Sequence, residues 1–395
     1  MNSQNTPVHI HLWHRDFWFM AIANLLLTMS VYVQIPVLPL WMMQTKHLTM
    51  VETGIAMGAF AAGLFLLGGI TSFLVQRYRR NMMCVWAILL TAGIQIGLYY
   101  IDKSDAAVFP VILLQRVLTG ALFGVAQMIL ASTLIIDTSE SFQRTEANHS
   151  ANWFGRFALS LGPVCALVLK SFGEPSMQGF DMVLLGSMGC CVLAAVLIML
   201  VNFPFKAPED NIRFFTSDRF YLAHGTWLFF NLFLITAAVG MLLCLPLHPM
   251  FYCMMMAGFL LALLSQKFVF ANAELKSEVV SGLFLIGSAQ LMLLSHQEVA
   301  HNYIAPIFIG TGIGIVGARF LLFFIKLSRH CQRGTSQSTY FLAWELGISA
   351  GLFAGYAYFN GNHHALVTVS FAVVALALIM YQLFTHNWYL KNKNR

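Results

Sequence analysis

One carboxylate lies inside a long apolar run near the C-terminal end of the chain. Glu345 is about ten residues beyond a turn-like entry, Arg333-Gly334-Thr335, which is roughly 15 Å along a helix. A lone acid in such surroundings is costly unless it has a partner or a task. Two interpretations are open. Burial favours the neutral form of an acid, so Glu345 can carry protons or act as a counter-charge for a substrate. Alternatively, it pairs permanently with a membrane arginine.

A second stretch, about half a chain earlier, resembles the first. Aligning Arg144 with Arg333 places Gly162 on Gly351 and Arg156 on Glu345. Two related segments therefore carry opposite charges at equivalent depths. Arginine does not titrate in a useful range, so Arg156 is expected either to bind an anionic group or to hold Glu345. If both side chains face one cavity, a substrate competes with Arg156 for Glu345.

Other polar residues inside apolar runs are candidates for lining a cavity. Asn24 and Tyr32 are eight positions apart, so they share one face of a helix, and polar groups within a span usually face the interior of a bundle. Weaker candidates of the same kind are Trp153, Asn231 and Trp344. Arg319 lies close to the end of its run, and we interpret it as a long side chain that reaches the lipid headgroups.

The composition identifies the environment that these residues require. Hydrophobic residues make up 58% of the chain and charged residues 10%, whereas soluble domains carry about a quarter charged residues. The formal charge of +6 is spread between apolar runs and forms no nucleic-acid-binding face. The seven cysteines lie almost entirely in those runs, as small apolar residues. We predict no cleaved signal peptide, because the first apolar run is too long.

Runs of about 20 apolar residues predict membrane-spanning helices, and twelve can be placed. Their expected ranges are Phe17–Met42, Thr53–Val75, Met82–Ile101, Phe109–Ile136, Ser150–Leu169, Phe180–Phe203, Thr226–Leu245, Met250–Phe270, Val280–Ser295, Tyr303–Leu327, Ser336–Phe359 and Ala365–Phe384. Glu345 and Arg156 thus fall in the eleventh and fifth spans. The segment 204–223 contains proline and several charges and is read as a linker between an N-terminal half, 1–203, and a C-terminal half, 224–395.

Basic residues predict the orientation, since they are retained on the cytoplasmic side. With the N-terminus inside, sixteen of the 22 Lys and Arg residues fall in cytoplasmic segments. The outer loops hold only Lys46, Lys103 and Lys170, and the other three lie within spans. Both termini are therefore predicted to be cytoplasmic, in a multi-pass protein of the cell's inner membrane.

The loop between the second and third spans carries a family resemblance. Residues 72–81 read Ser-Phe-Leu-Val-Gln-Arg-Tyr-Arg-Arg-Asn, which resembles the signature Gly-x-Leu-x-Asp-Arg-x-Gly-Arg-Arg of the major facilitator superfamily. The signature's acid is replaced by Gln76. In that family the loop is a gate latch, which implies gate roles for Arg77 and Arg80. The resemblance also implies that Arg80 pairs with Asp137 at the end of the fourth span.

Two further motifs are similar to those of the same family. The fourth span carries Arg116-Val-Leu-Thr-Gly120-Ala-Leu-Phe-Gly124, which resembles a motif linked to proton coupling and implies such a role for Arg116, with packing as the alternative. The fifth carries Gly162-Pro163, the core of a motif found in antiporter branches, and the resemblance implies a gate role for both residues. The entry to the eleventh span resembles the drug and sugar efflux branch.

The resemblance implies an all-α fold of twelve transmembrane helices in two six-helix bundles around a central cavity. We expect a secondary active transporter that works by alternating access, most simply the efflux of a small amphipathic molecule in exchange for protons or another ion. Uniport or symport of a sugar or metabolite is the alternative within transport, and a non-transporting membrane scaffold lies outside it. A mostly apolar cavity with one acid favours efflux, whereas many polar groups favour a metabolite.

The remaining expectations are absences and surroundings. The chain shows no nucleophile–base or metal-ligand constellation, so we predict neither an enzyme nor a bound metal or cofactor. Its expected partners are the small-molecule substrate, the coupling ion and the lipid bilayer, without nucleic acid, and the protein is expected to be a monomer.

Overall fold

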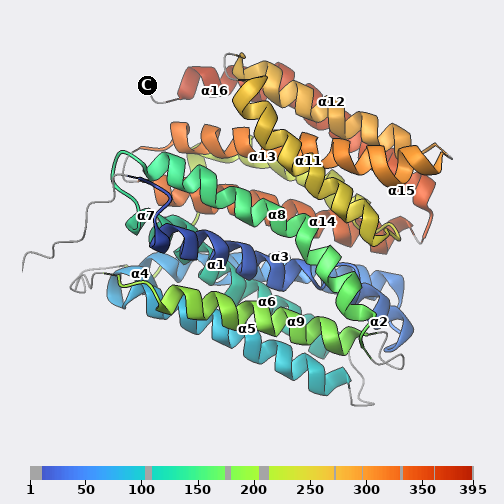
Figure 1. Cartoon of the computed structure of the whole chain (residues 1–395), viewed down its shortest axis with the longest axis horizontal. Helices are drawn as coiled ribbons and strands as arrows, with labels where there is room; N and C mark the ends of the chain where they lie inside the picture. Colours follow the sequence, from blue (N-terminus) through green and yellow to red (C-terminus); the bar gives the residue numbers. More distant parts are fainter. Residues whose placement is uncertain are drawn as a thin grey trace, which may run out of the picture.

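The fold is described from a computed structural model. It describes residues 11–102, 109–173, 179–203, 213–270, 273–295, 297–329, 332–359 and 361–393, and every regular element within these ranges is helical. The helices run side by side along the long axis of the molecule (Figure 1). Each of the twelve expected spans coincides with a helical run.

The N-terminal half supplies the first six runs. They are α1 (Arg15–Tyr32) with α2 (Leu38–Gln44); α3 (Met50–Leu66), η1 (Gly68–Ile70) and α4 (Thr71–Arg77); α5 (Arg80–Asp102); α6 (Phe109–Ile129), a π-helical turn η2 (Leu130–Leu134) and α7 (Ile135–Asp137); α8 (Arg144–Lys170); and α9 (Phe180–Met199). Thr49 starts α3 with a capping box, in which its hydroxyl accepts from the Glu52 N–H while the Glu52 carboxylate accepts from the Thr49 N–H.

The C-terminal half supplies the other six. They are η4 (Ala223–Gly225) with α10 (Thr226–Leu242); α11 (Pro249–Phe268); α12 (Leu275–Leu293); a π-helical turn η5 (Ala300–Ile304) with α13 (Ala305–Leu327); α14 (Arg333–Phe359); and α15 (His363–Met380), a π-helical turn η7 (Tyr381–Thr385) and α16 (His386–Asn392).

The two halves repeat one packing scheme. In the first, α1 packs against α8 and α9, and α3 packs against α6; in the second, α10 packs against α14 and α15, and α11 packs against α13. The expected alignment of the fifth and eleventh spans holds at both ends, because α8 and α14 are each 27 residues long and begin at Arg144 and Arg333. Arg156 and Glu345 are each the thirteenth residue of their helix.

Paired glycines bring equivalent helices together in both halves. A Cβ at Gly63 or Gly120 would collide with the backbone of the other helix of the α3–α6 pair, and one at Gly258 or Gly310 would do so in the α11–α13 pair. Small residues let membrane helices approach this closely. The same device therefore fixes the same crossing in each half.

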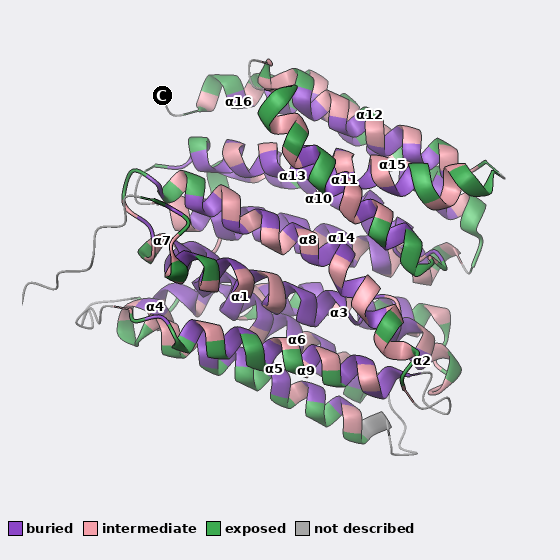
Figure 2. Cartoon of the chain, viewed as in Figure 1, coloured by how far each residue is buried: buried purple, intermediate pink, exposed green. Residues whose placement is uncertain are grey.

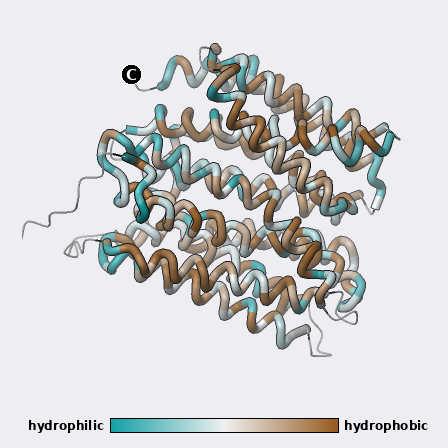
Figure 3. Tube along the Cα trace, in the orientation of Figure 1, coloured by the Kyte–Doolittle hydropathy of each residue, from teal (hydrophilic) through white to brown (hydrophobic). Residues whose placement is uncertain are grey.

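Contacts between the halves also come in matched pairs, since α3 packs against α14 and α11 packs against α8. In Figure 1, α8 and α14 lie in the middle of the stack, between the blue-green helices and the yellow-red ones. Buried residues gather toward this middle, and exposed residues lie on the outer helices (Figure 2). Many exposed residues are large and hydrophobic, and hydrophilic segments are frequent at the two ends (Figure 3).

Nine of the helical runs in the described ranges are long and apolar enough to cross a membrane by length and composition. The other three expected spans correspond to α1, α12 and α14. All three carry polar or charged residues within the helix, such as Asn24, Glu278 and Glu345. Two of these three, α1 and α14, line the cavity described below, which explains their lower hydropathy.

The described part of the linker, residues 213–222, lies at one end of the molecule, which we call the linker end. Asn392 of α16 shares a pocket with linker residues there. The ring of His14, just before α1, is 2.9 Å from the Thr138 carbonyl oxygen beyond α7. Both described chain ends therefore lie at the linker end, on the left of Figure 1. The opposite end is called the far end.

Candidate functional site

A small buried cavity lies between the two halves and contains both predicted charges. It is lined by Asn24, Thr28, Tyr32, Gln127, Ala131, Asn152, Gly155, Arg156, Gln337, Tyr340, Phe341, Trp344 and Glu345. Its volume is about 30 Å³, which is room for one or two water molecules. The site is therefore closed around its polar groups in this conformation.

Helical spacing explains why these residues meet. Positions 24, 28 and 32 lie on one face of α1, and positions 152, 155 and 156 lie on one face of α8. On α14 the lining positions are 337, 340, 341, 344 and 345, the i, i+3, i+4, i+7, i+8 stripe of a single helix face. Three helices of the N-terminal half and one of the C-terminal half thus enclose the cavity.

Glu345 is held by aromatic donors rather than by a cation. Its side chain is 3% exposed, and the Tyr32 hydroxyl donates to its Oε1 at 2.6 Å. The Trp344 indole N–H donates in turn to the Tyr32 oxygen at 3.1 Å. A tyrosine of one half is thereby placed between an acid and an indole of the other half, so Tyr32 joins the halves at the site.

Arg156 lies in the same cavity without an acidic partner. It is 2% exposed, its Nε–H donates to the Tyr340 hydroxyl at 3.3 Å, and its guanidinium carbon lies 4.5 Å from the centre of the Trp153 ring. Both terminal nitrogens are buried and have no hydrogen-bond partner among the described residues. Within those residues, no salt bridge of 4.0 Å or less joins Arg156 to Glu345.

The cavity therefore holds an acid and a guanidinium that are not paired with each other. Leaving a buried guanidinium donor unbonded costs more than one neutral hydrogen bond would contribute. Such a group at the centre of a protein is a ready site for an anionic ligand. The direct latch between Arg156 and Glu345, one of the interpretations of the sequence, is absent from this conformation.

Amide side chains form another wall. The Gln127 amide donates to Asn24 Oδ1 at 2.6 Å, and the Asn24 amide donates to the Ala151 carbonyl at 2.8 Å. Gly155 lies beside them, where a Cβ would come 3.2 Å from Asn24 Nδ2. This side of the cavity can accept or donate hydrogen bonds. The cavity is therefore more polar than an apolar cavity that contains a single acid.

Arg116 is buried elsewhere, within the N-terminal half. Its terminal nitrogen donates to the Gln34 side-chain oxygen at 3.3 Å, and its guanidinium carbon lies 5.1 Å from the centre of the Phe60 ring. Gln34 also donates to Ser187 of α9 at 3.1 Å. Arg116 thus belongs to a polar network between α1, α6 and α9, and it does not line the cavity of Glu345.

Two of the weaker candidates also lie outside the lining of this cavity. Asn231 faces α15, where its amide donates to the Ala377 carbonyl at 3.0 Å. Trp153 lies behind Arg156 and supports the guanidinium through its ring face. The sequence repeat aligns Asn231 of α10 with Asn24 of α1, but Asn231 bonds a carbonyl of α15 whereas Asn24 bonds a carbonyl of α8.

The predicted gate residues lie at the linker end and beside Tyr32. Arg80 donates to Asp137 at 2.6 Å, so the expected pair is present, and Arg77 is the last residue of α4. Gly162 packs against α1, where a Cβ would come 2.9 Å from that of Tyr32, and Pro163 follows it inside α8. Gly162 therefore sets how closely α8 approaches the tyrosine that holds Glu345.

The interpretation of Arg319 as a headgroup-seeking side chain was wrong. Its guanidinium makes two hydrogen bonds to Glu278 of α12, one from Nε at 2.8 Å and one from Nη2, and Glu278 is fully buried. The reason is the position of Glu278, which lies in the first turn of α12 and not before the span. A buried carboxylate one helix away binds the guanidinium more strongly than the interface would.

Several residues at the site were not predicted, and three of them bear on its charged and aromatic groups. Tyr340 bonds Arg156, Gln337 lines the cavity, and Gly317 of α13 lies behind both aromatic residues of α14. A Cβ at Gly317 would come 2.7 Å from the Trp344 ring and 3.3 Å from Arg156 Nε. Tyr340 and Gln337 could have been found from their helical spacing from Glu345. Nothing in the sequence singled out Gly317 except its place in a row of glycines, Gly310, Gly312, Gly314 and Gly317.

A second, larger pocket opens between the halves toward the far end. It has a volume of about 460 Å³, within the range of small-molecule sites. Its lining is mostly apolar and comes from both halves, including Leu40, Leu167, Leu247 and Tyr356. Tyr356 and Glu345 are eleven residues apart on α14, which is roughly 16 Å along the helix.

Comparison with known proteins agrees with the arrangement of the helices. A sequence model described as Major Facilitator Superfamily matches residues 20–352. No curated protein matches the chain.

Solved structures match over nearly the whole length. A bacterial homologue of the iron transporter ferroportin in an outward-facing state matches with a TM-score of 0.65 and 16% identity, over 95% of this chain and 99% of that one. A bacterial homologue of the human lysosomal transporter Spinster in an inward-facing conformation gives 0.66 and 14%, over 96% and 98%. An auto-inhibited peptide transporter of the POT family gives 0.66 and 13%, over 97% and 98%. Outward- and inward-facing structures match equally well, so the likeness describes the fold and not the state.

Proposed function

Because this chain belongs to the major facilitator superfamily and has its transporter fold, we propose that it is a proton-coupled secondary transporter that exports a small amphipathic molecule. Glu345 is the proton carrier. The substrate's polar group binds between Glu345 and Arg156, and alternating access moves it across the membrane. The halves that move are residues 1–203 and 224–395, joined by the linker 204–223.

The observation that supports this proposal is the pair of unneutralised charges. Glu345 is 3% exposed and bonded to Tyr32 without a cation within 4.0 Å among the described residues. An acid without a fixed counter-charge can gain and lose a proton as its surroundings change. A substrate group that donates hydrogen bonds or carries positive charge competes with that proton for Glu345. If only one of the two can be bound at a time, the transporter exchanges substrate for protons.

The amphipathic character of the substrate is supported by the second pocket. The polar cavity has room for one or two waters, so a substrate enters it only when the halves separate. The apolar pocket of about 460 Å³ lies on the far side of Glu345 between the same halves. A molecule with one polar group and an apolar body would fit the polar cavity with the first and the apolar pocket with the second.

The orientation of the molecule defines which end an exported substrate would leave from. Both described chain ends and the linker lie at one end of the molecule, and the distribution of Lys and Arg favours the cytoplasm for that end. The far end, with the apolar pocket, then faces the outside. We propose the inner membrane of the cell as the location.

A second candidate, symport of an anionic metabolite with a proton, is favoured by Arg156. Its two unbonded terminal nitrogens fit a carboxylate or phosphate, and Asn24, Gln127 and Asn152 supply polar contacts. A neutral Glu345 repels an anion less than a charged one does, so an anion and a proton would bind together. Exchange and symport thus predict opposite directions of substrate-driven proton flow.

Proteoliposomes that contain a pH-sensitive dye test both candidates. An amphipathic cation such as ethidium and a permanently ionised amphipathic anion such as decyl sulfate would be added as probes of opposite charge. Exchange predicts that the probe and protons move in opposite directions, and that Glu345→Gln abolishes the proton movement. Glu298→Gln, an exposed acid at the far end, is the matched control and should leave it unchanged. Probe-driven proton flux that persists in Glu345→Gln would sink the assignment.

A further inference from the structure

The linker is bonded to both halves at the linker end. Thr216 N–H donates to the Gly69 carbonyl at 3.0 Å, and Arg219 donates from its side chain to Thr133 at 2.9 Å; both partners belong to the N-terminal half. Leu222 N–H donates to the Thr339 hydroxyl of α14, in the C-terminal half, at 2.7 Å. A chain segment that only connected two bundles would need none of these bonds.

Asp218 is at the centre of these contacts. Its carboxylate accepts from the Ser72 hydroxyl at 3.3 Å and from the Thr335 hydroxyl at 3.0 Å, so it takes one hydrogen bond from each half. Ser72 also accepts from the Gln76 amide at 3.3 Å. The loop that lacks an acid at position 76 is therefore connected, through Ser72, to an acid supplied by the linker.

Aromatic side chains fix the linker against the N-terminal half. Phe215 covers Gly69 and Phe220 covers Gly68 so closely that a Cβ at either glycine would collide with the ring. Phe220 also meets Phe65 of α3 edge-on, with ring centres 6.0 Å apart. Two glycines in succession are thus the place where the linker docks.

The backbone of the docked linker is strained at one residue. Arg219 has a φ of +56°, a left-handed conformation that is uncommon for residues other than glycine. Such strain persists only where surrounding contacts hold it, and it is a frequent feature of elements that switch. Arg219 directly follows Asp218, and its own N–H donates to the Thr335 hydroxyl at 2.8 Å, so Thr335 is bonded to both residues.

From these contacts we propose that residues 213–222 are a latch that holds the linker end closed, with Asp218 as its central residue. The latch's purpose rests on the proposed transport function. Glu345 lies ten residues along α14 from Thr335, or roughly 15 Å, and the start of α14 packs against η2 in between. For the site to open at the linker end, these helices must separate, and the bonds from Asp218 to Ser72 and Thr335 cannot both survive.

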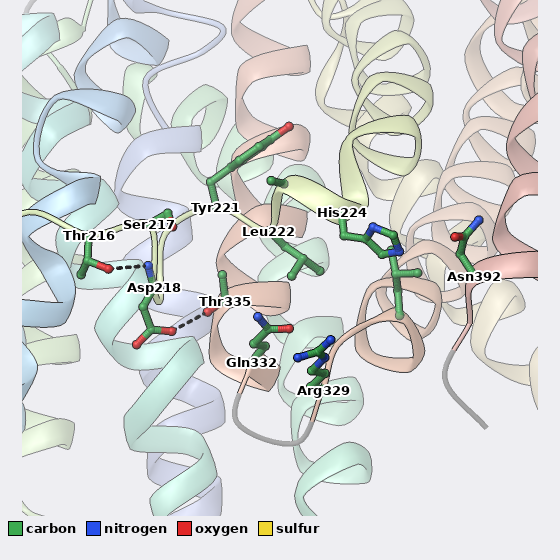
Figure 4. Close-up of a pocket in the computed structure, with 12 residues that line it drawn as sticks. Thr216, Ser217, Asp218, Tyr221, Leu222, His224, Arg329, Gln332, Thr335 and Asn392 are labelled. Atoms are coloured by element: carbon green, nitrogen blue, oxygen red, sulfur yellow. Dashed lines mark hydrogen bonds between the residues drawn. The ribbon is translucent and has the colours of Figure 1, made fainter.

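In Figure 4 the Asp218 carboxylate is directed at Thr335. A polar pocket of about 540 Å³ borders it, lined also by His224, Arg329 and Gln332. The Asp218 side chain is 46% exposed. The latch can therefore be reached from solvent and released without passing through the core.

The test measures the distance between the halves directly. Spin labels would be placed at Tyr78→Cys and Lys326→Cys, two exposed positions at the linker end of opposite halves, after replacing the seven native cysteines with alanine. Double electron–electron resonance on the protein in nanodiscs, without any substrate, then gives the distribution of distances between the two labels. Asp218→Ala should raise the ratio of long to short distances roughly tenfold, because two hydrogen bonds to a carboxylate are lost.

Control variants separate the loss of the latch from the loss of any exposed acid or from misfolding. Glu146→Ala removes another exposed acid at the linker end and should leave the distances unchanged. If Asp218→Ala does not fold, Ser72→Ala and Thr335→Val each remove one of the two bonds and should give smaller shifts in the same direction. Unchanged distances in a folded Asp218 variant would overturn the latch, even if the melting temperature fell. Because no proton or substrate enters this measurement, its result stands apart from that of the Glu345 experiment.

Discussion

At the scale of single residues, the protein contains two kinds of buried charge. Arg319 and Glu278 form a double hydrogen bond within the C-terminal half. Arg156 and Glu345 belong to different halves and bond instead to Tyr340 and Tyr32. A pair that is fully bonded holds helices in place, whereas charges without ionic partners are free to receive ligands. This contrast supports the view that Arg319 and Glu278 form a structural pair and that Arg156 and Glu345 are the residues of the proposed site.

The first prediction concerns the shape of the Arg156 side chain. Arg156→Lys keeps the charge but loses the Nε–H bond to Tyr340 and the flat contact with Trp153, and lysine cannot offer two parallel donors. We expect the apparent affinity for a transported anionic probe to fall by roughly tenfold or more, about 1.4 kcal/mol, with unchanged expression. Concentration dependence of uptake in proteoliposomes measures it, and an unaltered affinity would remove Arg156 from the binding site.

The second prediction concerns the structural pair. Glu278→Gln leaves the largely buried Arg319 without a counter-charge, which should lower the free energy of unfolding by about 3 kcal/mol. Thermal unfolding in detergent measures the loss, with the exposed Glu298→Gln as the control. The double variant Glu278→Gln/Arg319→Gln should recover part of the stability. If Glu278→Gln unfolds like the wild type, the pair does not stabilise the fold.

At the scale of elements, glycines decide how closely the helices approach. Those at the α3–α6 and α11–α13 crossings are equivalent in the two halves, while Gly93 and Gly97 of α5 have no neighbouring atoms that a Cβ would meet. Gly317 is a third kind, because it makes room for side chains of the candidate site. The row of glycines in α13 thus combines packing against α11 with support of Trp344.

The third prediction uses that difference. Gly317→Ala places a methyl group 2.7 Å from the Trp344 ring and 3.2 Å from the Tyr340 hydroxyl. The hydrogen bond that Trp344 donates to Tyr32 and the one that Tyr340 accepts from Arg156 must therefore shift. We expect transport to fall at least tenfold and the free energy of unfolding to fall by about 1–3 kcal/mol, the usual cost of an added methyl in a packed site. Gly97→Ala, where the added methyl meets nothing, is the control. Equal activities of the two variants would contradict the role given to Gly317.

The elements were largely predictable from sequence, and the site only in part. Apolar length places the twelve runs because the bilayer fixes how long a span must be. The repeat predicted that Arg156 and Glu345 share a depth, and both line one cavity. Glu278 was missed because its partner Arg319 is 41 residues away on another helix, and no spacing within one helix connects them.

Aromatic residues show a second limit. The chain has 34 Phe and 12 Tyr residues, so composition could not single out Tyr340 or predict its bond to Arg156. Its spacing from Glu345 along α14 would have placed it on the cavity face. Asn231 shows the opposite error. The repeat aligns it with Asn24, which lines the cavity, but Asn231 does not line it. Equivalent positions share a fold, but their neighbours differ between the halves.

At the scale of the whole molecule, the fourth prediction tests which end faces the cytoplasm. On a cysteine-free background, Phe142→Cys, an exposed position at the linker end, should react with a membrane-impermeant maleimide only after the cells are permeabilised. Glu298→Cys at the far end should react in intact cells. The reverse pattern would invert the orientation and, with it, the direction of the proposed export.

The equal placement of Arg156 and Glu345 in two helices of equal length has an electrical consequence. When Glu345 is ionised, the two side chains sum to zero charge at one depth, and reorienting the empty site moves no charge through the membrane field. When Glu345 carries a proton, the site holds one positive charge, and its reorientation feels about 2.3 kcal/mol per 100 mV. In the proposed cycle, the membrane voltage therefore acts on the reorientation that carries the proton, and it does not act on the reorientation of the empty site with an ionised Glu345.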